Sequence, residues 1–464
     1  MKSNFSKGLL MTALITGSVI WGGTNVFAEE LQEYTLDQMV VTATRTEKRD
    51  VEVPASTEIL THDKILASGA TNAMEALSKV NGLEFKSYFP GGSAMTTMTP
   101  EINIRGLSTG TLVLVNGNPL NLNNKYVIDA IPVESIEKIE IIKGGGSILY
   151  GSEAMAGVVN IITKKTANNS VSIGYGNYGQ QKYNVSVGND KLKVNYDLKK
   201  WGEVNNLSAS ANPPTSSAYQ YSQDRNHKEN IGIGYNITDN LSFEYNHLDS
   251  SVDYHRNKII SNAFEQWRET YTKQDLFQLN YNSDSVKAHM WYTQNKINYY
   301  GGSKPGVYTR NTLTETKNAT YGLDVQKDIS LSEKSLLTVG ANAKKEKYEP
   351  QIIKGDSAKS SDKKERNQFA VFAQLDQKFT DKDNLIIGGR GTWTSGSTNG
   401  EEYDDFSASA QYVHKFNEDK SVYISVGQSF IMPSFSQMYP SGVAAGAPNR
   451  SEERRVGKEC RSRW

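Results

Sequence analysis

The stretch Ile136–Thr163, IEKIEIIKGGGSILYGSEAMAGVVNIIT, decides the fold of the chain. Residues 136–142 and 158–162 are runs with alternating apolar residues, of the length and composition that predict β-strands. The segment between them holds five glycines, which let the backbone take positive φ in tight turns: Gly144, Gly145, Gly146, Gly151 and Gly157. The stretch therefore predicts two short strands in a compact domain rather than a linker.

A glycine cluster that follows a strand can instead cradle a phosphate group. Gly144 and Gly146 form G-x-G, but Leu149 stands where a dinucleotide fingerprint needs its third glycine. Gly151 is followed by Ser152, where a Walker motif would need its lysine. The motif thus fails at its most demanding positions, and no nucleotide site is predicted.

The stretch resembles the end of the plug domain of TonB-dependent outer-membrane receptors. That family has a strand like IEKIEIIKG, a small-residue turn, LYGS, and a strand like GVVNIITK, and the match runs from Ile136 to Lys164. It departs from the family at Lys143, where arginine is usual, and at Gly145, where proline is usual. Both changes keep the charge and the turn. An upstream I-R-G motif at residues 104–106 also resembles the family.

The resemblance implies structural roles for several residues of the plug. Arg105 is expected to be a buried cation that pairs with a carboxylate between plug and barrel, because a lone arginine among strands must find partners. The residues expected to shape the plug are Arg105, Gly106, Gly144, Gly146, Tyr150, Gly151, Gly157 and Asn160.

The first residues predict a secretory signal peptide that is removed after Ala28. Lys2 and Lys7 precede an apolar run over residues 8–21, and residues 26–28 (VFA) supply the small residues of a cleavage site. A transmembrane anchor is the weaker interpretation, because the apolar core is short and interrupted by glycines. The mature chain is therefore expected to be exported to the outer membrane of a Gram-negative cell.

The last fifteen residues, RSEERRVGKECRSRW (450–464), differ in composition and side-chain pattern from the rest of the chain. They lack alternation and match the translation of a common sequencing adapter, so we expect a non-native tail after Asn449. The full sequence has 51 basic and 51 acidic residues; without this tail and the two lysines of the leader, 43 basic residues face 48 acidic ones. Cys460 is the only cysteine. No disulfide framework is expected to hold the exported chain.

A polar arm, residues 29–50, precedes the first domain and contains the β-prone run DQMVVTA. Such a run in a solvated arm is expected to be mobile until it pairs with the strand edge of another chain. It resembles the TonB box of the receptor family, which implies TonB, with its inner-membrane energising complex, as a partner. The box comprises Asp37, Gln38, Met39, Val40, Val41, Thr42 and Ala43.

Residues 51–165 read as a small α+β domain. Thr57–Leu60 predicts a strand, and Thr61 and Thr71 are placed to cap two short helices. Further strands are expected at residues 83–85, 102–104 and 112–115, the last ending in the hairpin signal Asn116-Gly117.

From Ser170 the chain changes to long alternating segments. Residues 191–199 place Leu192, Val194, Tyr196 and Leu198 on one face and polar side chains on the other. We count 13 strands, the last at Ser421–Phe430, joined alternately by short turns and long polar loops, the pattern of outer-membrane barrels. The resemblance implies a mainly β protein with the plug inside a 22-stranded transmembrane barrel, of which about 13 strands are present. The long loops are predicted at about 202–228, 247–270, 298–312, 350–365 and 396–404.

Candidate ligand residues lie in the plug loop over residues 87–100. Tyr88 and Phe89 would face the external vestibule by resemblance, where aromatic rings suit a siderophore or corrin face. Met95 and Met98 could offer thioethers to copper, but packing or an apolar ligand contact is the favoured interpretation. His247 and His255 fall in one predicted loop, which could capture haem or metal; solvated loop histidines are favoured. No metal site is predicted.

The sequence therefore indicates a monomeric receptor that takes up an iron–siderophore complex across the outer membrane, in contact with its lipid and energised through TonB. Vitamin B12 or haem is the alternative ligand, and a passive porin or adhesin is the alternative class. Nothing in the residue pattern picks out a catalytic pair or triad, a cofactor or a nucleic-acid surface, so an enzyme is not expected.

Overall fold

The computed structural model describes residues 39–40, 42, 48–86, 89, 92, 101–107, 109–122, 125–144, 146–166, 169–209, 218–304, 307–308, 313–354, 357–360, 363–397, 402–418, 420–439 and 453–462. The predicted signal peptide and most of the predicted arm lie outside these residues. None of the helices within them is long and apolar enough to cross a bilayer.

An N-terminal α+β domain is built on a five-stranded sheet in the order β3-β8-β9-β6-β7. All its pairings are antiparallel except that of β6 with β9. A separate hairpin pairs β4 with β5, and β1 pairs with β2. Its strands and helices are β1 (Met39–Val40), β2 (Lys48–Arg49), η1 (Asp50–Glu52), β3 (Ser56–Thr61), α1 (His62–Ala67), α2 (Ala73–Leu77), β4 (Leu83–Lys86), β5 (Glu101–Ile104), β6 (Thr111–Val115), β7 (Asn118–Pro119), η2 (Val133–Ser135), β8 (Ile136–Lys143), α3 (Ser147–Tyr150), η3 (Ser152–Ala154) and β9 (Gly157–Thr163).

The two strands predicted from the glycine-rich stretch are β8 and β9, and they pair with each other. Their apolar side chains form the centre of the domain core, with Ile139, Val159 and Ile161 fully buried. Gly157 has a φ of 155°, and a side chain there would meet the carbonyl oxygen of Ile142 at 2.2 Å. A glycine is therefore required where β9 begins.

The two predicted helices form, but one predicted cap is wrong. Thr61 caps α1 by accepting a hydrogen bond from the backbone N–H of Lys64. The cap of α2 is Asn72, whose side chain accepts from the N–H of Glu75 at 2.9 Å, and not Thr71. Thr71 instead donates its hydroxyl to the Glu75 carboxylate at 2.9 Å. Threonine and asparagine can both cap a helix, so the residue at which the helix begins decides which of the two does.

The rest of the described chain forms one antiparallel sheet whose strands follow sequence order. Apart from three short strands beside the long ones (β13, β18, β21) and β26, it contains 13 long strands among the described residues, as predicted. Its strands are β10 (Ser170–Gly176), β11 (Gln180–Gly188), β12 (Leu192–Trp201), β13 (Val204–Ala209), β14 (Tyr219–Asn236), β15 (Leu241–Lys258), β16 (Phe264–Asn282), β17 (Val286–Lys304), β18 (Val307–Tyr308), β19 (Leu313–Ser332), β20 (Ser335–Lys354), β21 (Ser357–Ser360), β22 (Lys364–Lys378), β23 (Asp383–Ser395), β24 (Asp404–Lys415), β25 (Ser421–Ile431) and β26 (Glu453–Ser462); η4 (Asn177–Gly179) and α4 (Phe435–Met438) are short helices beside them.

The predicted short turns are confirmed, but several predicted long loops are too long. β15 continues to Lys258 and β16 begins at Phe264, so most of the predicted loop 247–270 is strand. Likewise β17 reaches Lys304 and β20 reaches Lys354. Backbone hydrogen bonds continue a ladder into water as well as through lipid, so polar side chains mark exposure to water and not the end of pairing.

His247 and His255 therefore lie on one strand, β15, and not in a loop. His247 pairs with Asp275 at 2.8 Å, and His255 pairs with Asp224 at 2.6 Å. Each ring has its own carboxylate partner. Among the described residues no group of three or more metal-ligating side chains gathers.

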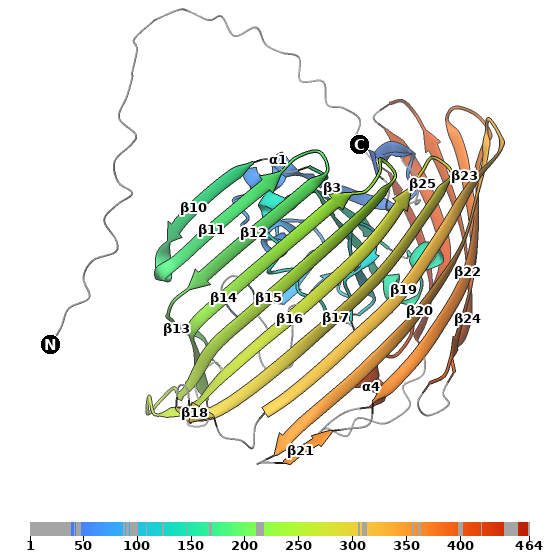
Figure 1. Ribbon diagram of the computed structural model, residues 1–464. Helices are drawn as coiled ribbons and strands as arrows, with labels where there is room; N and C mark the ends of the chain where they lie inside the picture. Colours follow the sequence, from blue (N-terminus) through green and yellow to red (C-terminus); the bar gives the residue numbers. More distant parts are fainter. Residues whose placement is uncertain are drawn as a thin grey trace, which may run out of the picture. The chain divides into compact units, whose positions relative to one another are not determined.

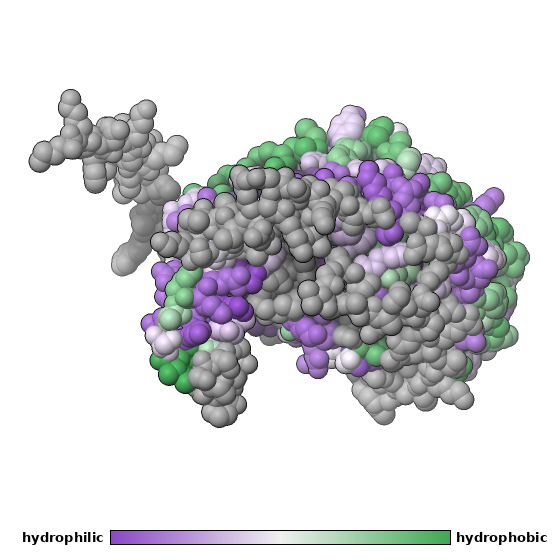
Figure 2. Space-filling model, turned by 90° about the horizontal axis from the view of Figure 1, so that it is seen from below, coloured by the Kyte–Doolittle hydropathy of each residue, from purple (hydrophilic) through white to green (hydrophobic). Residues whose placement is uncertain are grey.

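The sheet has its polarity reversed relative to a water-soluble protein. One face, here called the inner face, contacts the N-terminal domain and buries polar side chains such as Asn195, Gln274 and Thr293. Seen from the end that carries β18 and β21, hydrophilic residues gather toward the middle and hydrophobic residues toward the margin (Figure 2). Large apolar side chains are exposed on the opposite, outer face: Phe277, Met290, Tyr321, Leu323, Val325, Phe369, Val371, Ile387, Trp393, Phe406, Tyr412, Ile424 and Val426.

The N-terminal domain lies against the inner face of the sheet (Figure 1), with contacts that extend from β11 to β25. Glu134 pairs with Lys182 on β11, Asp129 with Lys228 on β14 and Glu153 with Lys344 on β20. At the far side, α3 and η3 contact β25. The sheet thus wraps round the domain, as a plug within a barrel requires.

The predicted non-native tail contributes β26, which pairs with β25. A strand without a neighbour offers unpaired backbone groups that any extended segment can bind. The pairing therefore carries no information on the origin of the tail, which stays a prediction.

Candidate functional site

Thr42, in the segment predicted as a TonB box, is bound inside the N-terminal domain. Its backbone N–H and its hydroxyl both donate to Oε2 of Glu140, at 2.8 and 2.6 Å. Glu140 lies on β8, is fully buried, and pairs through Oε1 with Lys138 at 2.7 Å. A buried carboxylate that accepts two hydrogen bonds from one residue fixes the position of that residue.

Two residues of the glycine-rich stretch complete the Thr42 site. The Nδ2 group of Asn160 donates to the Thr42 hydroxyl at 3.0 Å, and the Tyr150 hydroxyl donates to the Thr42 carbonyl at 3.0 Å. Asn160 Oδ1 also accepts from the N–H of Gly117 at 3.1 Å. The structure therefore brings together Thr42 and two residues expected only to shape the plug.

The segment around Thr42 differs from the expectation of an arm without contacts. Met39–Val40 forms β1 and pairs with Lys48–Arg49 of the same chain. The β-prone run thus uses an edge within its own chain. Asp37, Gln38, Val41 and Ala43 lie outside the described residues, so the assignment of the box stays a prediction.

A second anchor follows the box and attaches the chain to the sheet. Lys48 pairs with Asp376 on β22, while Glu52 pairs with Lys415 on β24 at 2.8 Å and with Arg49 at 3.0 Å. Burial alone would raise the pKa of Glu52, but the hydrogen bonds and charges of Lys415 and Arg49 outweigh it and lower the pKa to about 2. The Glu52 carboxylate is thus held ionised at neutral pH.

A fully buried ion pair joins the middle of the domain to the sheet. Asp129 accepts hydrogen bonds from Lys228 on β14 and, at 2.8 Å, from Ser250 on β15. The side chains of Asp129 and Lys228 are 2% and 1% exposed. Removing one partner of such a pair leaves an uncompensated buried charge, so the pair fixes the register of domain and sheet.

A chain of charges connects the loop before β9 to β20 and β22. Glu153 pairs with Lys344 at 2.8 Å, Lys344 with Glu346 at 3.4 Å, and Glu346 with Arg366 at 2.9 Å. Arg366 also donates to the carbonyl of Pro433 at 3.1 Å. The chain links the domain to the segment that begins α4.

Nearer the long-loop end, tyrosines and arginines gather on the inner face of β14–β17. Arg256 lies over the ring of Tyr219 at 4.4 Å, and Arg268 lies over the ring of Tyr299 at 4.8 Å. These side chains share the inner face because the register opposes them to inner-face neighbours. Each arginine is held over its ring by cation–π attraction. Arg256 Nε faces Glu265 and Arg268 Nη2 donates to Gln266, and the other N–H groups of each guanidinium can donate to an anion. We call this the luminal cluster: Tyr219, Tyr221, Tyr254, Arg256, Arg268 and Tyr299.

Phe89, predicted as a ligand contact, is buried beside the luminal cluster. Its ring lies 4.9 Å from that of Tyr254 and packs in a small core with Val252. In the structure the Phe89 side chain packs against β15. Tyr88, Met95 and Met98 lie outside the described residues, so their roles as ligand contacts stay predictions.

The other predicted plug residues lie where the backbone turns. Arg105 and Gly106 have φ values of 53° and 78° and form the turn after β5, and Gly144 has a φ of 139° after β8. Gly146 lies against Val158. Gly151 has a φ of 85°, and a Cβ atom there would lie 3.1 Å from Nη2 of Arg390. The pairing of Arg105 with a carboxylate stays a prediction.

Sequence reasoning missed the luminal cluster and the charged residues of the inner face. The arginines and tyrosines stand in regions predicted as loops, and no spacing relates residues 219, 256, 268 and 299. Lysines on the polar face of a strand, such as Lys193 and Lys199, were the available signal for the contacts with the plug.

The two parts of the structure match two family models. Residues 49–158 match the TonB-dependent Receptor Plug Domain, and residues 164–454 match the TonB dependent receptor-like beta-barrel. The chain therefore belongs to the TonB-dependent receptor family. Members of this family are outer-membrane receptors and transporters that interact with TonB.

Individual relatives transport different ligands. The chain is 25% identical over 461 residues to the vitamin B12 transporter BtuB of Vibrio vulnificus, a match that covers 93% of this chain and 68% of that protein. Its fold is similar to that of the ferric-catecholate import receptor Fiu of E. coli, with a TM-score of 0.63, 14% identity, and coverage of 92% of this chain and 73% of that one. The ferripyoverdine receptor of the outer membrane of Pseudomonas aeruginosa gives a TM-score of 0.60 at 16% identity, covering 86% of this chain and 60% of that one.

Proposed function

We propose that this chain serves TonB-dependent active uptake of an iron–siderophore complex across the outer membrane. The observation that carries the proposal is the luminal cluster, in which two guanidinium groups and four tyrosines share the inner face of the sheet beside the plug. The proposal is for the receptor as a whole, of which this chain spans the plug and part of the barrel.

The chemistry of the cluster favours an anionic ligand rich in oxygen and aromatic groups. Ferric complexes of catecholates or carboxylates carry negative charge on their outer oxygens. Arginine donates paired hydrogen bonds to such oxygens. The half-buried Tyr219 and Tyr221 offer ring surface and hydroxyls, whereas Tyr254 packs against Phe89. The Glu265 carboxylate lies 2.7 Å from Arg256 Nε and partly neutralises its charge. An anionic ligand would displace this carboxylate or share the guanidinium with it.

Energy reaches the site mechanically in this proposal. TonB would bind Asp37–Ala43 as an added strand, which requires this segment to leave its own edge and the Thr42 site first. The pull would have to break the contacts of Lys48 with Asp376 and of Glu52 with Lys415, which attach the chain to the sheet, before it acts on the plug. No residue of the chain is assigned a catalytic role.

Vitamin B12 is the second candidate ligand. The match to a vitamin B12 transporter covers 93% of this chain, and aromatic side chains also suit a corrin face. The two candidates differ in charge. A corrin edge is lined by neutral amides, which gain less from Arg256 and Arg268 than a ferric chelate does.

Uptake by the host bacterium tests the proposal. Radioactive iron bound to a panel of catecholate, hydroxamate and carboxylate siderophores, and radioactive cobalamin, are offered to cells with the native gene, a deletion, or Arg256→Ala with Arg268→Ala. Uptake of one ferric siderophore that is lost in the deletion and falls at least tenfold in the double variant supports the proposal. Arg225→Ala, at a side chain 69% exposed, is the matched control.

Deleting residues 37–43 separates the classes of protein. A TonB-coupled receptor keeps ligand binding but loses uptake, whereas a passive porin keeps uptake. Cobalamin uptake with no ferric uptake would overturn the siderophore assignment in favour of vitamin B12. No uptake phenotype of any kind would favour an adhesin.

A further inference from the structure

Asn160, one of the two residues that complete the Thr42 site, also holds the turn between β6 and β7. Its Nδ2 group donates to the Thr42 hydroxyl at 3.0 Å, and its Oδ1 atom accepts from the backbone N–H of Gly117 at 3.1 Å. Because a backbone N–H can only donate, it fixes which end of the amide faces the turn. The side chain of Asn160 is buried, and it contacts Thr42 with one end and the turn with the other.

The hydrogen bonds through Asn160 and Thr42 run in one direction. Gly117 donates to Asn160, Asn160 donates to the Thr42 hydroxyl, and this hydroxyl donates to Glu140 at 2.6 Å. Hydrogen bonds in such a chain strengthen one another. The departure of Thr42 would take away the acceptor of Asn160 Nδ2 and, at the same time, two donors to Glu140 Oε2.

Asn160 and Glu140 are direct neighbours in the plug sheet. They stand opposite each other in the antiparallel pairing of β8 with β9. Side chains at such positions lie on the same face, with Cβ atoms roughly 4.5–5.5 Å apart. A buried carboxylate that has lost donors is costly, so the amide of Asn160 is placed to turn toward Glu140 when Thr42 leaves. Its Oδ1 atom then no longer accepts from Gly117.

The β6–β7 turn is attached to the inner face of the sheet. Nδ2 of Asn116 donates to Glu244 on β15, and Nδ2 of Asn118 donates to Oδ1 of Asn280 on β16 at 2.8 Å. Gly117 lies between these two contacts in the sequence. Asn116 has a φ of 51°, a conformation that a residue other than glycine keeps only where its surroundings hold it. The turn therefore depends on the acceptor of the Gly117 N–H.

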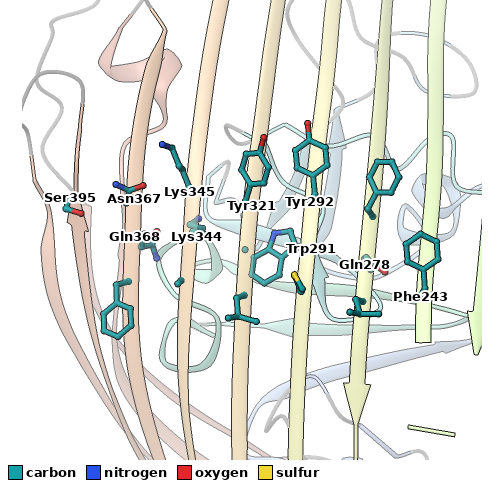
Figure 3. Close-up of a pocket in the computed structure, with 17 residues that line it drawn as sticks. Phe243, Gln278, Trp291, Tyr292, Tyr321, Lys344, Lys345, Asn367, Gln368 and Ser395 are labelled. Atoms are coloured by element: carbon teal, nitrogen blue, oxygen red, sulfur yellow. The ribbon is translucent and has the colours of Figure 1, made fainter. Parts of the chain in front are cut away.

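Beyond the turn, the plug contacts β16 through neutral groups. Gln278 and Gln274 donate to the carbonyls of Val115 and Leu120 at 2.9 and 2.7 Å. Figure 3 views the outer face, with Tyr292 in front of the strands and Gln278 behind them, on the side of the plug. The ion pairs described above lie on β11, β14 and β20. Water can replace a neutral hydrogen bond, whereas separating a buried ion pair leaves bare charges, so the plug is held less firmly at β16.

β16 also leads from the turn to the luminal cluster. Its inner-face positions run through the even-numbered residues from Arg268, in the cluster, to Asn280, at the turn. The strand from residue 268 to residue 280 spans roughly 40 Å. A gap between the plug and β16 would therefore connect the luminal cluster with the β6–β7 turn.

We propose that Asn160 couples the release of Thr42 to the detachment of the β6–β7 turn from β15 and β16. Asn160 is a positioning residue. With Thr42 in place its amide holds Gly117, and once Thr42 leaves, the amide turns to Glu140 and frees the turn. The gap that follows lies along β16, below the luminal cluster. The coupling rests on the proposed function for its trigger, TonB, but it can be measured without TonB or ligand.

Hydrogen exchange of the purified receptor, read by mass spectrometry, tests the coupling. Deleting residues 37–43 removes Thr42 and stands in for the released segment. The amides of residues 116–120 should then exchange at least tenfold faster than in the native receptor. Deleting residues 30–36 is the matched control, because it removes seven residues and keeps Thr42, and it should change nothing. Strands β4 and β5 are the internal control for the plug and should exchange equally in all three proteins.

Two substitutions test whether the coupling passes through Asn160. Asn160→Leu keeps the volume but cannot hold Gly117, so residues 116–120 should exchange fast with or without residues 37–43. Glu140→Leu removes the acceptor to which the amide turns, so the deletion should then accelerate exchange less than twofold. A turn that exchanges at the native rate after the deletion would overturn the proposal, as would a full response to the deletion in Glu140→Leu.

The exchange result and the uptake result are independent of each other. A receptor that transports no ferric siderophore refutes the proposed function and leaves the exchange response of residues 116–120 in place. A receptor that transports its ligand but shows no exchange response refutes the coupling alone.

Discussion

Glu140 and Thr42 are joined by two hydrogen bonds although 98 residues separate them, and the carboxylate that accepts both is fully buried. Thr42, a residue of the predicted TonB box, is thereby held against β8 of the plug sheet. Any partner that takes residues 37–43 as an added strand must first break this contact.

Thr42→Val should release the predicted TonB box, because valine keeps the shape of threonine but removes its hydroxyl. A hydrogen bond to a charged group contributes about 1.5–3 kcal/mol, so the released population should rise at least tenfold. The measurement is the rate of maleimide labelling of Met39→Cys in a Cys460→Ser background. Glu140→Gln should act in the same direction, whereas Glu137→Gln, an exposed change on the same strand, should leave the rate unchanged. Equal labelling in all variants would show that the contact does not hold the segment.

Asp129→Asn should destabilise the plug within the barrel by about 3–5 kcal/mol, because it leaves Lys228 charged and buried. The plug should become sensitive to protease and unfold at lower denaturant concentration. Replacing both partners together, with Asp129→Leu and Lys228→Met, should recover most of the loss. Lys86→Ala, in a pair whose side chains are 53% and 40% exposed, should cost under about 1 kcal/mol. A single Asp129 variant as stable as the native receptor would contradict the inferred role.

Gly157→Ala should prevent the plug from folding. A Cβ atom at this residue would lie 2.2 Å from the carbonyl oxygen of Ile142 within the β8–β9 pairing. Gly82→Ala is the matched control: it also has a positive φ, 79°, but open space around it. It should cost only about 1–2 kcal/mol of backbone strain. Protease resistance of the plug, with heat-modifiable migration of the barrel as the check on the sheet, distinguishes the two variants.

The anchor at Glu52 should weaken in acid. Its pKa is about 2 in the folded chain against 4.5 for the free group, so its stabilising effect is complete above pH 4.5 and is lost as the pH falls toward 2. A spin label at Val51→Cys, with Cys460→Ser, should gain mobility over that range. Glu52→Gln should be mobile at every pH. The same acid transition in this variant would assign the effect to other groups.

The sequence predicted the backbone pattern of this protein well. The runs at 136–142 and 158–162 became β8 and β9, the Asn116-Gly117 signal became the β6–β7 hairpin, and residues 191–199 alternate across β12 as expected. These features follow from local rules, since side-chain period and glycine freedom are properties of a few consecutive residues. Polar side chains led to a wrong prediction of loops where strands continue beyond the membrane, as at His255 on β15.

What the sequence by itself determined is therefore the order of elements, the faces of the strands and the family resemblance. Only the tertiary structure decided that Thr42 meets Glu140 and that Lys228 meets Asp129. Each of these depends on register between distant strands, and a slip of one residue moves every side chain to the other face. Such contacts form only when the sheet has packed around the plug, so no local sequence pattern encodes them.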